Sequence, residues 1–151
     1  MKIMRASFNF RSKSFAVYGL GLTGKSVVNF LKRNKANKIF TWDDKFNKSN
    51  VKLKNIFKFN LNRVDYIVMS PGIDIQKSKF KKLLLKNKKK IITDLDLFFL
   101  RNKVKKSIII TGTNGKSTTC YLVHHILKKN KIKNKLAGNI GRPILNLEFI
   151  K

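Results

Sequence analysis

The sequence predicts an α/β protein: a Rossmann-like, parallel-sheet domain followed by the start of a second α/β unit of the P-loop type. Short apolar runs alternate with helical patterns along the chain, which is typical of strand-helix-strand units that build a parallel sheet. A glycine loop follows the first apolar run, and another glycine loop follows a later run, after a break in the pattern. The 151 residues have room for one domain and part of a second.

The first elements of the predicted domain surround a glycine loop. Phe15–Tyr18 is expected to form a strand that leads into Gly19-Leu20-Gly21-Leu22-Thr23-Gly24. The helix that follows would place Val27, Val28 and Leu31 on one face. A second strand is expected at Ile39–Trp42, ending at Asp43 and Asp44. The next stretch is polar and rich in lysine, and neither a helix nor a strand is predicted there.

The remaining elements of this domain are shorter. Tyr66–Met69 is predicted to be a strand that stops at Ser70-Pro71-Gly72, because proline and glycine favour a turn. A helix through Phe80, Leu83 and Leu84 and a short strand at Lys90–Thr93 would follow. Asp94 is expected to cap a last helix at Leu95–Leu100.

Residues 101–106 carry no apolar periodicity and separate two complete patterns. We therefore predict a basic lead over residues 1–14, a first domain over 15–101, a linker over 102–106 and the start of a second domain over 107–151. In the second unit, Ser107–Ile110 is expected to be a strand, Thr111–Ser117 a loop and Thr118–Lys129 a helix. Its inward face would carry Leu122, Val123, Ile126 and Leu127, and a short strand near 135–137 would precede Gly138-Asn139-Ile140-Gly141.

The composition is strongly basic, with 35 lysine and arginine residues against 7 aspartate and glutamate residues and a formal charge of +28. The lysines are spread over every predicted face and turn, which indicates a solvated cationic surface, and no nucleic-acid partner is predicted. The single cysteine, Cys120, has no Cys/His cluster around it. No apolar run reaches the roughly 18 residues of a membrane span, so we expect a cytoplasmic protein with no membrane insertion.

The second glycine loop, Thr111-Gly112-Thr113-Asn114-Gly115-Lys116-Ser117-Thr118, has the setting of a phosphate cradle. Backbone N–H groups and the helix dipole at a helix start favour an anion, and glycines let phosphate oxygens approach. Lys116 would supply a cation for the β and γ phosphates, and the Ser117 hydroxyl would bind Mg²⁺. A full Walker A motif needs a glycine where this chain has Ile110, so the loop is a tighter variant. The alternative is a helix start with a surface lysine.

The first loop matches the spacing G-x-G-x-x-G through Gly19, Gly21 and Gly24, with Asp43 at the end of the next strand. That pattern suits a dinucleotide whose ribose meets the carboxylate. The same backbone geometry serves any diphosphate, including that of a UDP-sugar. A UDP-sugar site, an NAD site and a purely structural tight turn therefore all stay open, with the first preferred.

Four segments together resemble the Mur ligases, and most of all the members that add D-glutamate: residues 19–24, Ser70-Pro71-Gly72-Ile73, residues 110–118 and residues 138–141. Their order and spacing match from about Phe15 to Pro143. The resemblance implies that Leu22 and Thr23 lie against the uracil nucleotide and its diphosphate, that Ser70 reaches the uracil or ribose, and that Asn139 contacts the muramoyl peptide. It also implies that residues from Gly112 to Thr118 hold ATP. The family's Thr-Arg pair after the second strand is replaced here by Asp44-Lys45, where Asp44 would repel a phosphate.

The implied reaction is the ATP-dependent joining of D-glutamate to UDP-N-acetylmuramoyl-L-alanine through an acyl phosphate, with Mg²⁺ and with Lys116 as the catalytic residue. The family's downstream metal-binding glutamate, modified lysine and amino-acid-binding domain have no counterpart before Lys151. We therefore expect a truncated chain that does not complete the ligation alone. The alternatives are a nucleotide-binding module without ligase activity and, less favoured, a basic nucleic-acid-binding protein.

Overall fold

The computed structural model describes residues 8–45, 51–102, 106–138 and 140–147. Its centre is a four-stranded, all-parallel sheet in the order β2-β1-β3-β4. The strands are β1 (Ser14–Tyr18), β2 (Lys38–Trp42), β3 (Tyr66–Met69) and β4 (Ile91–Ile92). All four were predicted to within two residues at each end, so the Rossmann-like α/β prediction is confirmed for the first unit.

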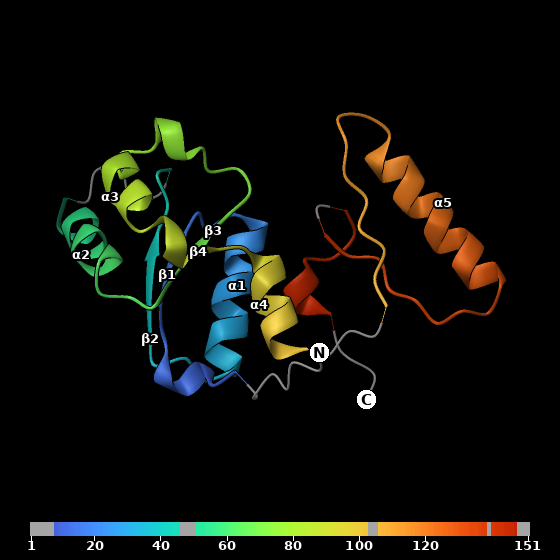
Figure 1. Ribbon diagram of the computed structural model, residues 1–151, viewed down its shortest axis with the longest axis horizontal. Helices are drawn as coiled ribbons and strands as arrows, with labels where there is room; N and C mark the ends of the chain where they lie inside the picture. The colour runs from blue at the N-terminus through green and yellow to red at the C-terminus, as the bar shows by residue number, and fades with distance from the viewer. Residues whose placement is uncertain (1–7, 46–50, 103–105, 139, 148–151) are drawn as a thin grey trace.

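Helices cover both faces of this sheet (Figure 1). On one face lie α1 (Leu22–Arg33) and α4 (Asp94–Arg101), and on the other lie α2 (Val51–Leu61) and α3 (Lys81–Lys86). Successive β1 side chains alternate between the two layers. Phe15 and Val17 join the α1/α4 core, and Ala16 and Tyr18 join the α2/α3 core. Such a sheet, buried on both faces, explains why its strands read as continuous apolar runs.

Two sequence predictions for this unit are corrected by the structure. The lysine-rich stretch contains α2, whose Phe57 and Leu61 are buried at 1% and 0% exposure. These two residues are spaced i, i+4 and so share one helix face. The cap of α4 is Thr93 and not Asp94, because Thr93 accepts a hydrogen bond from the Asp96 backbone while the Asp96 carboxylate accepts from Thr93. This reciprocal arrangement satisfies two backbone donors at once.

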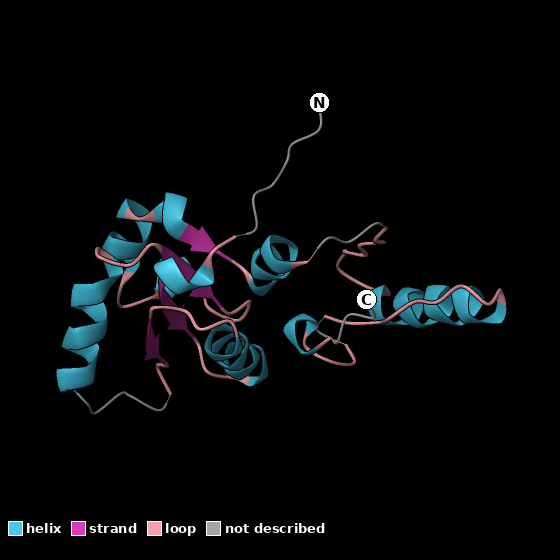
Figure 2. Ribbon diagram, turned by 90° about the horizontal axis from the view of Figure 1, so that it is seen from below, coloured by secondary structure: helices cyan, strands magenta, loops and turns pink. Residues whose placement is uncertain are grey.

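The second unit is far less complete. Residues 106–115 form no strand, so the prediction of a strand at Ser107–Ile110 is wrong. The prediction for 135–137 is also wrong, since only an isolated bridge joins Ala137 to Arg142. A strand needs a neighbour to pair its backbone groups, and no described strand lies beside either segment. The helix α5 (Lys116–Lys129) is present and stands away from the sheet in both views (Figures 1 and 2).

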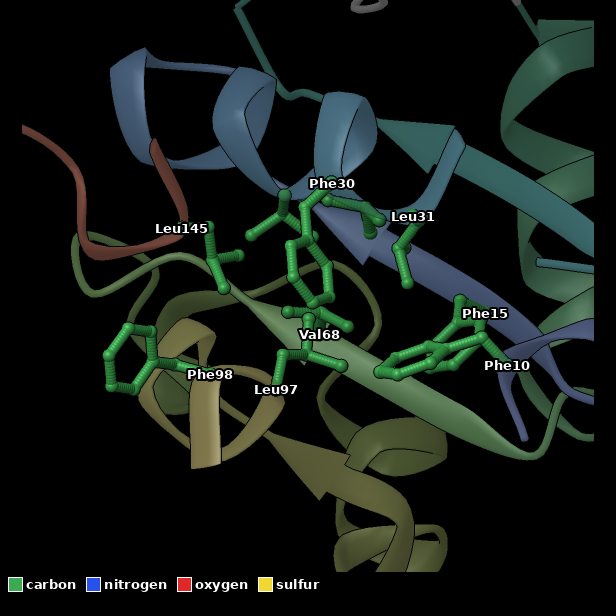
Figure 3. Close-up of a cluster of buried hydrophobic side chains, with 10 residues drawn as sticks. Phe10, Phe15, Phe30, Leu31, Val68, Leu97, Phe98 and Leu145 are labelled. Atoms are coloured by element: carbon green, nitrogen blue, oxygen red, sulfur yellow. The ribbon is translucent and has the colours of Figure 1, made fainter. Parts of the chain in front are cut away.

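The predicted inward face of α5 is not covered. The helix has no buried residue, and Leu122 and Ile126 are 57% and 49% exposed. Residues 144–146 behave differently, because they form a short 3-10 helix next to α1 and α4. Leu145 belongs to the α1/α4 core and lies near Phe30 and Phe98, as Figure 3 shows. In the described part of the chain, no helix has the length and apolar character needed to cross a lipid bilayer.

Candidate functional site

The order of the strands marks one crevice of the sheet. The chain leaves β1 for β2 on one side and then crosses over to β3 on the other side. In an open parallel sheet, ligands bind where such connections diverge, outside the carboxyl ends of the strands. Here that point lies between the loop after β1, residues 19–24, and the turn after β3, residues 70–72. The two segments predicted to hold a nucleotide therefore meet at one edge of the sheet.

Three small residues are packed tightly at this point. Gly19 has a φ of +93°, and a Cβ there would lie 2.8 Å from the Cβ of Ser70. A Cβ on Gly24 would lie 1.8 Å from the carbonyl oxygen of Gly19. The start of α1 is thus drawn against the loop to a degree that only glycine permits. This close approach explains two of the three glycines in the pattern, Gly19 and Gly24, whereas a Cβ on Gly21 would meet nothing within 4 Å.

Ser70 holds the loop from the neighbouring strand. Its hydroxyl donates to the Gly19 carbonyl at 3.0 Å, and its backbone N–H donates to Tyr18 O at 3.0 Å. The predicted contact of Ser70 with a uracil or ribose stays a prediction, and the hydroxyl oxygen keeps acceptor capacity for it. The structure adds a second role that the sequence did not indicate: Ser70 ties the β3 turn to the glycine loop.

Asp43 binds the protein backbone. It is 8% exposed, and its two carboxylate oxygens accept from the N–H groups of Leu20 at 2.6 Å and Lys45 at 2.8 Å. The ribose contact suggested by the dinucleotide pattern would have to reach a carboxylate that is almost fully buried. Asp43 instead fixes the loop after β2 to the glycine loop, and both loops are held in one conformation.

Asp44 faces inward, which answers the concern that it would repel a phosphate. Its carboxylate accepts from Tyr18 Oη at 2.6 Å and Trp42 Nε1 at 3.0 Å, and Lys79 Nζ lies 3.4 Å away. Burial alone would raise the pKa of Asp44, but the hydrogen bonds from Tyr18, Trp42 and Lys79 outweigh it and hold the pKa below its ordinary value. Burial, together with Asp44, raises the pKa of Tyr18. The negative charge of Asp44 is therefore compensated within the protein.

The outer side of the first loop is open to solvent. Leu22, the first residue of α1, is 74% exposed, and Thr23 beside it is half-buried. The helix begins after Gly21 with no side-chain cap. Backbone N–H groups of the first turn have no partner within a helix, so this end offers donors to an anion. Leu22 and Thr23 lie beside those donors, and their predicted contact with a uracil nucleotide stays a prediction.

The second loop bends around the ammonium group of Lys116. Its Nζ donates to the carbonyl oxygens of Gly112 and of Thr113, the latter at 2.9 Å. Gly115 precedes α5 with a φ of +73° and no side-chain cap. Lys116 and the uncapped start of α5 are thus next to each other, as a phosphate cradle requires.

The residues predicted to bind ATP and Mg²⁺ are all accessible. Residues 111–119 are exposed, Asn114, Ser117 and Thr118 among them. No group of three or more His, Cys, Asp or Glu side chains that suits a metal ion occurs in the described part of the chain. The Ser117 hydroxyl could hold Mg²⁺ only together with phosphate oxygens, which matches the way Mg²⁺ binds at nucleotide sites.

The two loops are not joined to each other. No hydrogen bond links residues 19–24 to residues 111–118 among the described residues. Asn139, predicted to contact the muramoyl peptide, lies outside the described residues. His124 bonds to Asn134, and Cys120 is half-buried in α5. The structure thus places Leu22, Thr23 and Ser70 at one edge of the sheet and leaves the second glycine loop separate from it.

The sequence did not indicate the hydrogen-bond network that lies beneath this edge. The Tyr18, Asp44 and Lys79 network, with the Ser78 hydroxyl 3.0 Å from Tyr18 Oη, was not predicted. One signal for it was available: two adjacent aspartates follow β2, and the side chains of neighbouring residues at a strand end point in different directions.

Comparisons with known proteins agree on one family. Residues 13–92 match the family model described as Mur ligase MurD-like, N-terminal domain. The chain is 35% identical to the UDP-N-acetylmuramoylalanine–D-glutamate ligase of Wolbachia pipientis wMel, over 92% of this chain and 29% of that protein. It is 38% identical to the ligase of the same name from Francisella philomiragia, over 93% of this chain and 33% of that protein. The chain therefore spans about a third of the length of the curated relatives it matches.

Proposed function

The chain belongs to the Mur ligase MurD-like family, and on that premise we propose that it forms the UDP-sugar-binding part of a ligase that joins D-glutamate to UDP-N-acetylmuramoyl-L-alanine. The reaction would serve the synthesis of a peptidoglycan precursor. The proposal rests on the glycine loop at the crevice between β1 and β3, where Gly19, Gly24 and Ser70 are in close contact.

This edge suits a UDP-sugar better than NAD. The uncapped start of α1 supports binding of a diphosphate, which either ligand has. NAD recognition would use a carboxylate at the end of β2 for a ribose hydroxyl. Here the Asp43 carboxylate already accepts from two backbone N–H groups, and Asp44 is held by Tyr18 and Trp42. The NAD alternative is therefore less favoured, because its ribose would have to reach the buried Asp43 carboxylate.

The second loop would hold ATP with Mg²⁺. Lys116 and the N–H groups at the start of α5 would bind the terminal phosphates, and Ser117 would contribute its hydroxyl to the metal. When bound, Mg·ATP supplies the phosphoryl group that activates the substrate carboxylate for attack by the D-glutamate amine. Lys116 would then exchange its loop carbonyls for phosphate oxygens, since an ammonium group bonds more strongly to an anion than to neutral carbonyls.

Leu22 provides the sharpest test of the first site. At 74% exposure it contributes little to folding, so Leu22→Ser is expected to keep the fold and to weaken UDP-N-acetylmuramoyl-L-alanine binding by about tenfold. Leu85→Ser is the matched control, because Leu85 is also exposed, at 45%, and lies on α3. Calorimetric titration of both variants measures the difference. Equal affinities in the two variants would contradict the site.

The alternative is a nucleotide-binding module without ligase activity, which would keep both glycine loops. Thermal unfolding with Mg·ATP, compared between the wild type and Lys116→Ala, tests the second loop. The ligase proposal further requires phosphate release from ATP that depends on both the muramoyl substrate and D-glutamate when this segment is part of a full-length protein. ATP binding without such release would favour the module.

A further inference from the structure

A concave site lies at the opposite end of the sheet from the glycine loop. It is a cavity of about 310 Å³ lined by the segment before β1, the end of α1 and the end of α4. Its lining includes Arg11, Arg33, Lys35 and Arg101, with Phe8 and Phe10 as apolar walls. None of these residues belongs to the proposed UDP-sugar or ATP sites. The cavity therefore needs an explanation of its own.

The arginines of the chain are concentrated here. The sequence has 29 lysines but only six arginines, and three of those six line this one cavity. A general preference for lysine explains a cationic surface, but it does not explain why the rare arginines gather in one concave place. Arginine has a planar set of donors that binds two oxygens of a phosphate at once, whereas lysine acts as a point charge.

Two of the three guanidinium groups are held in place by the protein. Arg101 Nε donates to Asn34 Oδ1 at 2.9 Å, and Arg33 Nη2 donates to Leu145 O at 3.0 Å. Asn34 is itself fixed, because its Nδ2 donates to Phe30 O at 2.8 Å. A guanidinium has five N–H donors, so each of these arginines keeps most of them for another partner. Less side-chain entropy is then lost when an anion binds.

Among the described residues, the lining has four cations and no carboxylate. The ion pairs found among the described residues, Lys13 with Asp65 and Lys79 with Asp44, lie elsewhere. Cations at the ends of α1 and α4 are favourable to the helix dipoles, which accounts for Arg33, Lys35 and Arg101 but not for Arg11. Cations gathered in one cavity repel each other, and a multivalent anion would relieve that repulsion.

We propose that this cavity binds a small molecule with two or more linked phosphate groups. The size of the cavity fits such a group, and the three arginines can share its oxygens. A nucleic-acid backbone is less suitable, because a long strand needs a continuous groove rather than one compact depression. The site is separate from the UDP-sugar site, so either proposal can fail without the other.

Inorganic tripolyphosphate is the probe, titrated calorimetrically at low ionic strength. All proteins in the comparison carry Lys116→Ala, which removes the competing cation of the second loop. Arg11→Ala with Arg101→Ala is expected to weaken binding by about tenfold or more. Arg63→Ala is the matched control, since Arg63 lies 4.0 Å over the Phe59 ring on another part of the surface. Its affinity should stay within about twofold of the parent.

Arg11→Ala alone separates a loss of binding from a loss of folding. The hydrogen bond found for Arg11 involves its backbone N–H and not its guanidinium, so the substitution should not disturb the fold. It should reduce affinity without changing the unfolding temperature. Arg101→Lys keeps the charge and removes the planar donors, and it should also bind more weakly. Full affinity in Arg101→Lys, an equal loss in Arg63→Ala, or a short single-stranded DNA that binds as tightly through the same arginines would each overturn the proposal.

Discussion

The two glycine loops stand in similar sequence settings, with an apolar run before each and a helix after it, yet they differ in what surrounds them. Around the first loop, Phe15 and Val17 are 0% and 1% exposed, and α1 is packed onto the sheet. Around the second, Ile108 and Ile109 are 64% and 68% exposed, and no residue of α5 is buried. A strand-loop-helix pattern becomes a folded unit only when neighbouring strands and helices cover its apolar residues.

The energetic consequence follows from burial. A fully buried aliphatic or aromatic side chain stabilises the folded state by about 1.5–3 kcal/mol relative to an exposed one. In the first region, many side chains on both faces of the sheet contribute this stabilisation. In the second region, few side chains do. We therefore expect substitutions of similar chemistry to have very different effects on the free energy of unfolding in the two regions.

The largest difference is expected between two glycines. Gly24→Ala places a Cβ 1.8 Å from a backbone carbonyl oxygen and should lower the free energy of unfolding by about 3–5 kcal/mol. Gly115→Ala, with a φ of +73° but open space around it, strains only the second loop and should leave the unfolding of the sheet domain unchanged. Urea unfolding followed by Trp42 fluorescence reports on the sheet domain. Wild-type stability in Gly24→Ala would contradict the described loop packing.

Two leucines sharpen the same contrast. Leu97 on α4 is 0% exposed, and Leu97→Ala should cost about 3 kcal/mol through lost burial and the cavity left behind. Leu122→Ala on α5 removes the same atoms from a side chain that is 57% exposed and should cost less than about 0.5 kcal/mol. Equal losses, measured from the urea midpoints, would mean that the α5 face is covered in solution.

Leu145 tests where the boundary between the two regions lies. It follows the second loop in sequence but is 3% exposed in the core of the first region (Figure 3). Leu145→Ala should therefore destabilise the sheet domain by about 2 kcal/mol. The exposed Ile132→Ala is the control and should have almost no effect. An unaltered unfolding transition in Leu145→Ala would show that residues 143–147 do not contribute to this core.

The smallest expected effect concerns pH. The described residues from 106 onward contain no aspartate or glutamate, so any acid dependence from described carboxylates arises in the first region. The pKa of Asp44 is lowered in the folded state below its ordinary value of 3.8. Its contribution is therefore fully present above pH 3.8 and is lost as the pH falls through the lowered value.

Asp44→Asn should remove this part of the acid sensitivity and cost about 1 kcal/mol at neutral pH, because charge-assisted hydrogen bonds to Tyr18 and Trp42 are weakened. Unfolding in urea at a series of pH values, for the wild type and the variant, gives the comparison. The two curves should converge at the lowest pH. Parallel curves over the whole range would indicate that the Asp44 network does not form.

The first region was more predictable from its sequence than the second, for physical reasons. Its strands are buried on both faces, and such strands appear as apolar runs whatever their neighbours. The helix α2 escaped prediction because lysines and asparagines surround Phe57 and Leu61. Ser107–Ile110 has the composition of a strand, but its state depends on pairing partners that its own residues do not specify.

The candidate site was also only partly predictable from the sequence. Glycine spacing predicted the tight loop, since close approach of a backbone requires glycine at fixed positions. The bond between Ser70 and Gly19 joins residues 51 positions apart, and the bond between Asp43 and Leu20 joins residues 23 apart. A local pattern does not reveal which of two adjacent aspartates will turn toward the backbone.

We propose above all that the edge formed by residues 19–24 and 70–72 binds a UDP-sugar. Amide hydrogen exchange with and without UDP-N-acetylmuramoyl-L-alanine tests it most directly. We predict slower exchange at residues 21–24 and at Gly72, with no change in the middle of α5. Unchanged exchange at these residues, or the same protection with NAD in place of the UDP-sugar, would contradict the account.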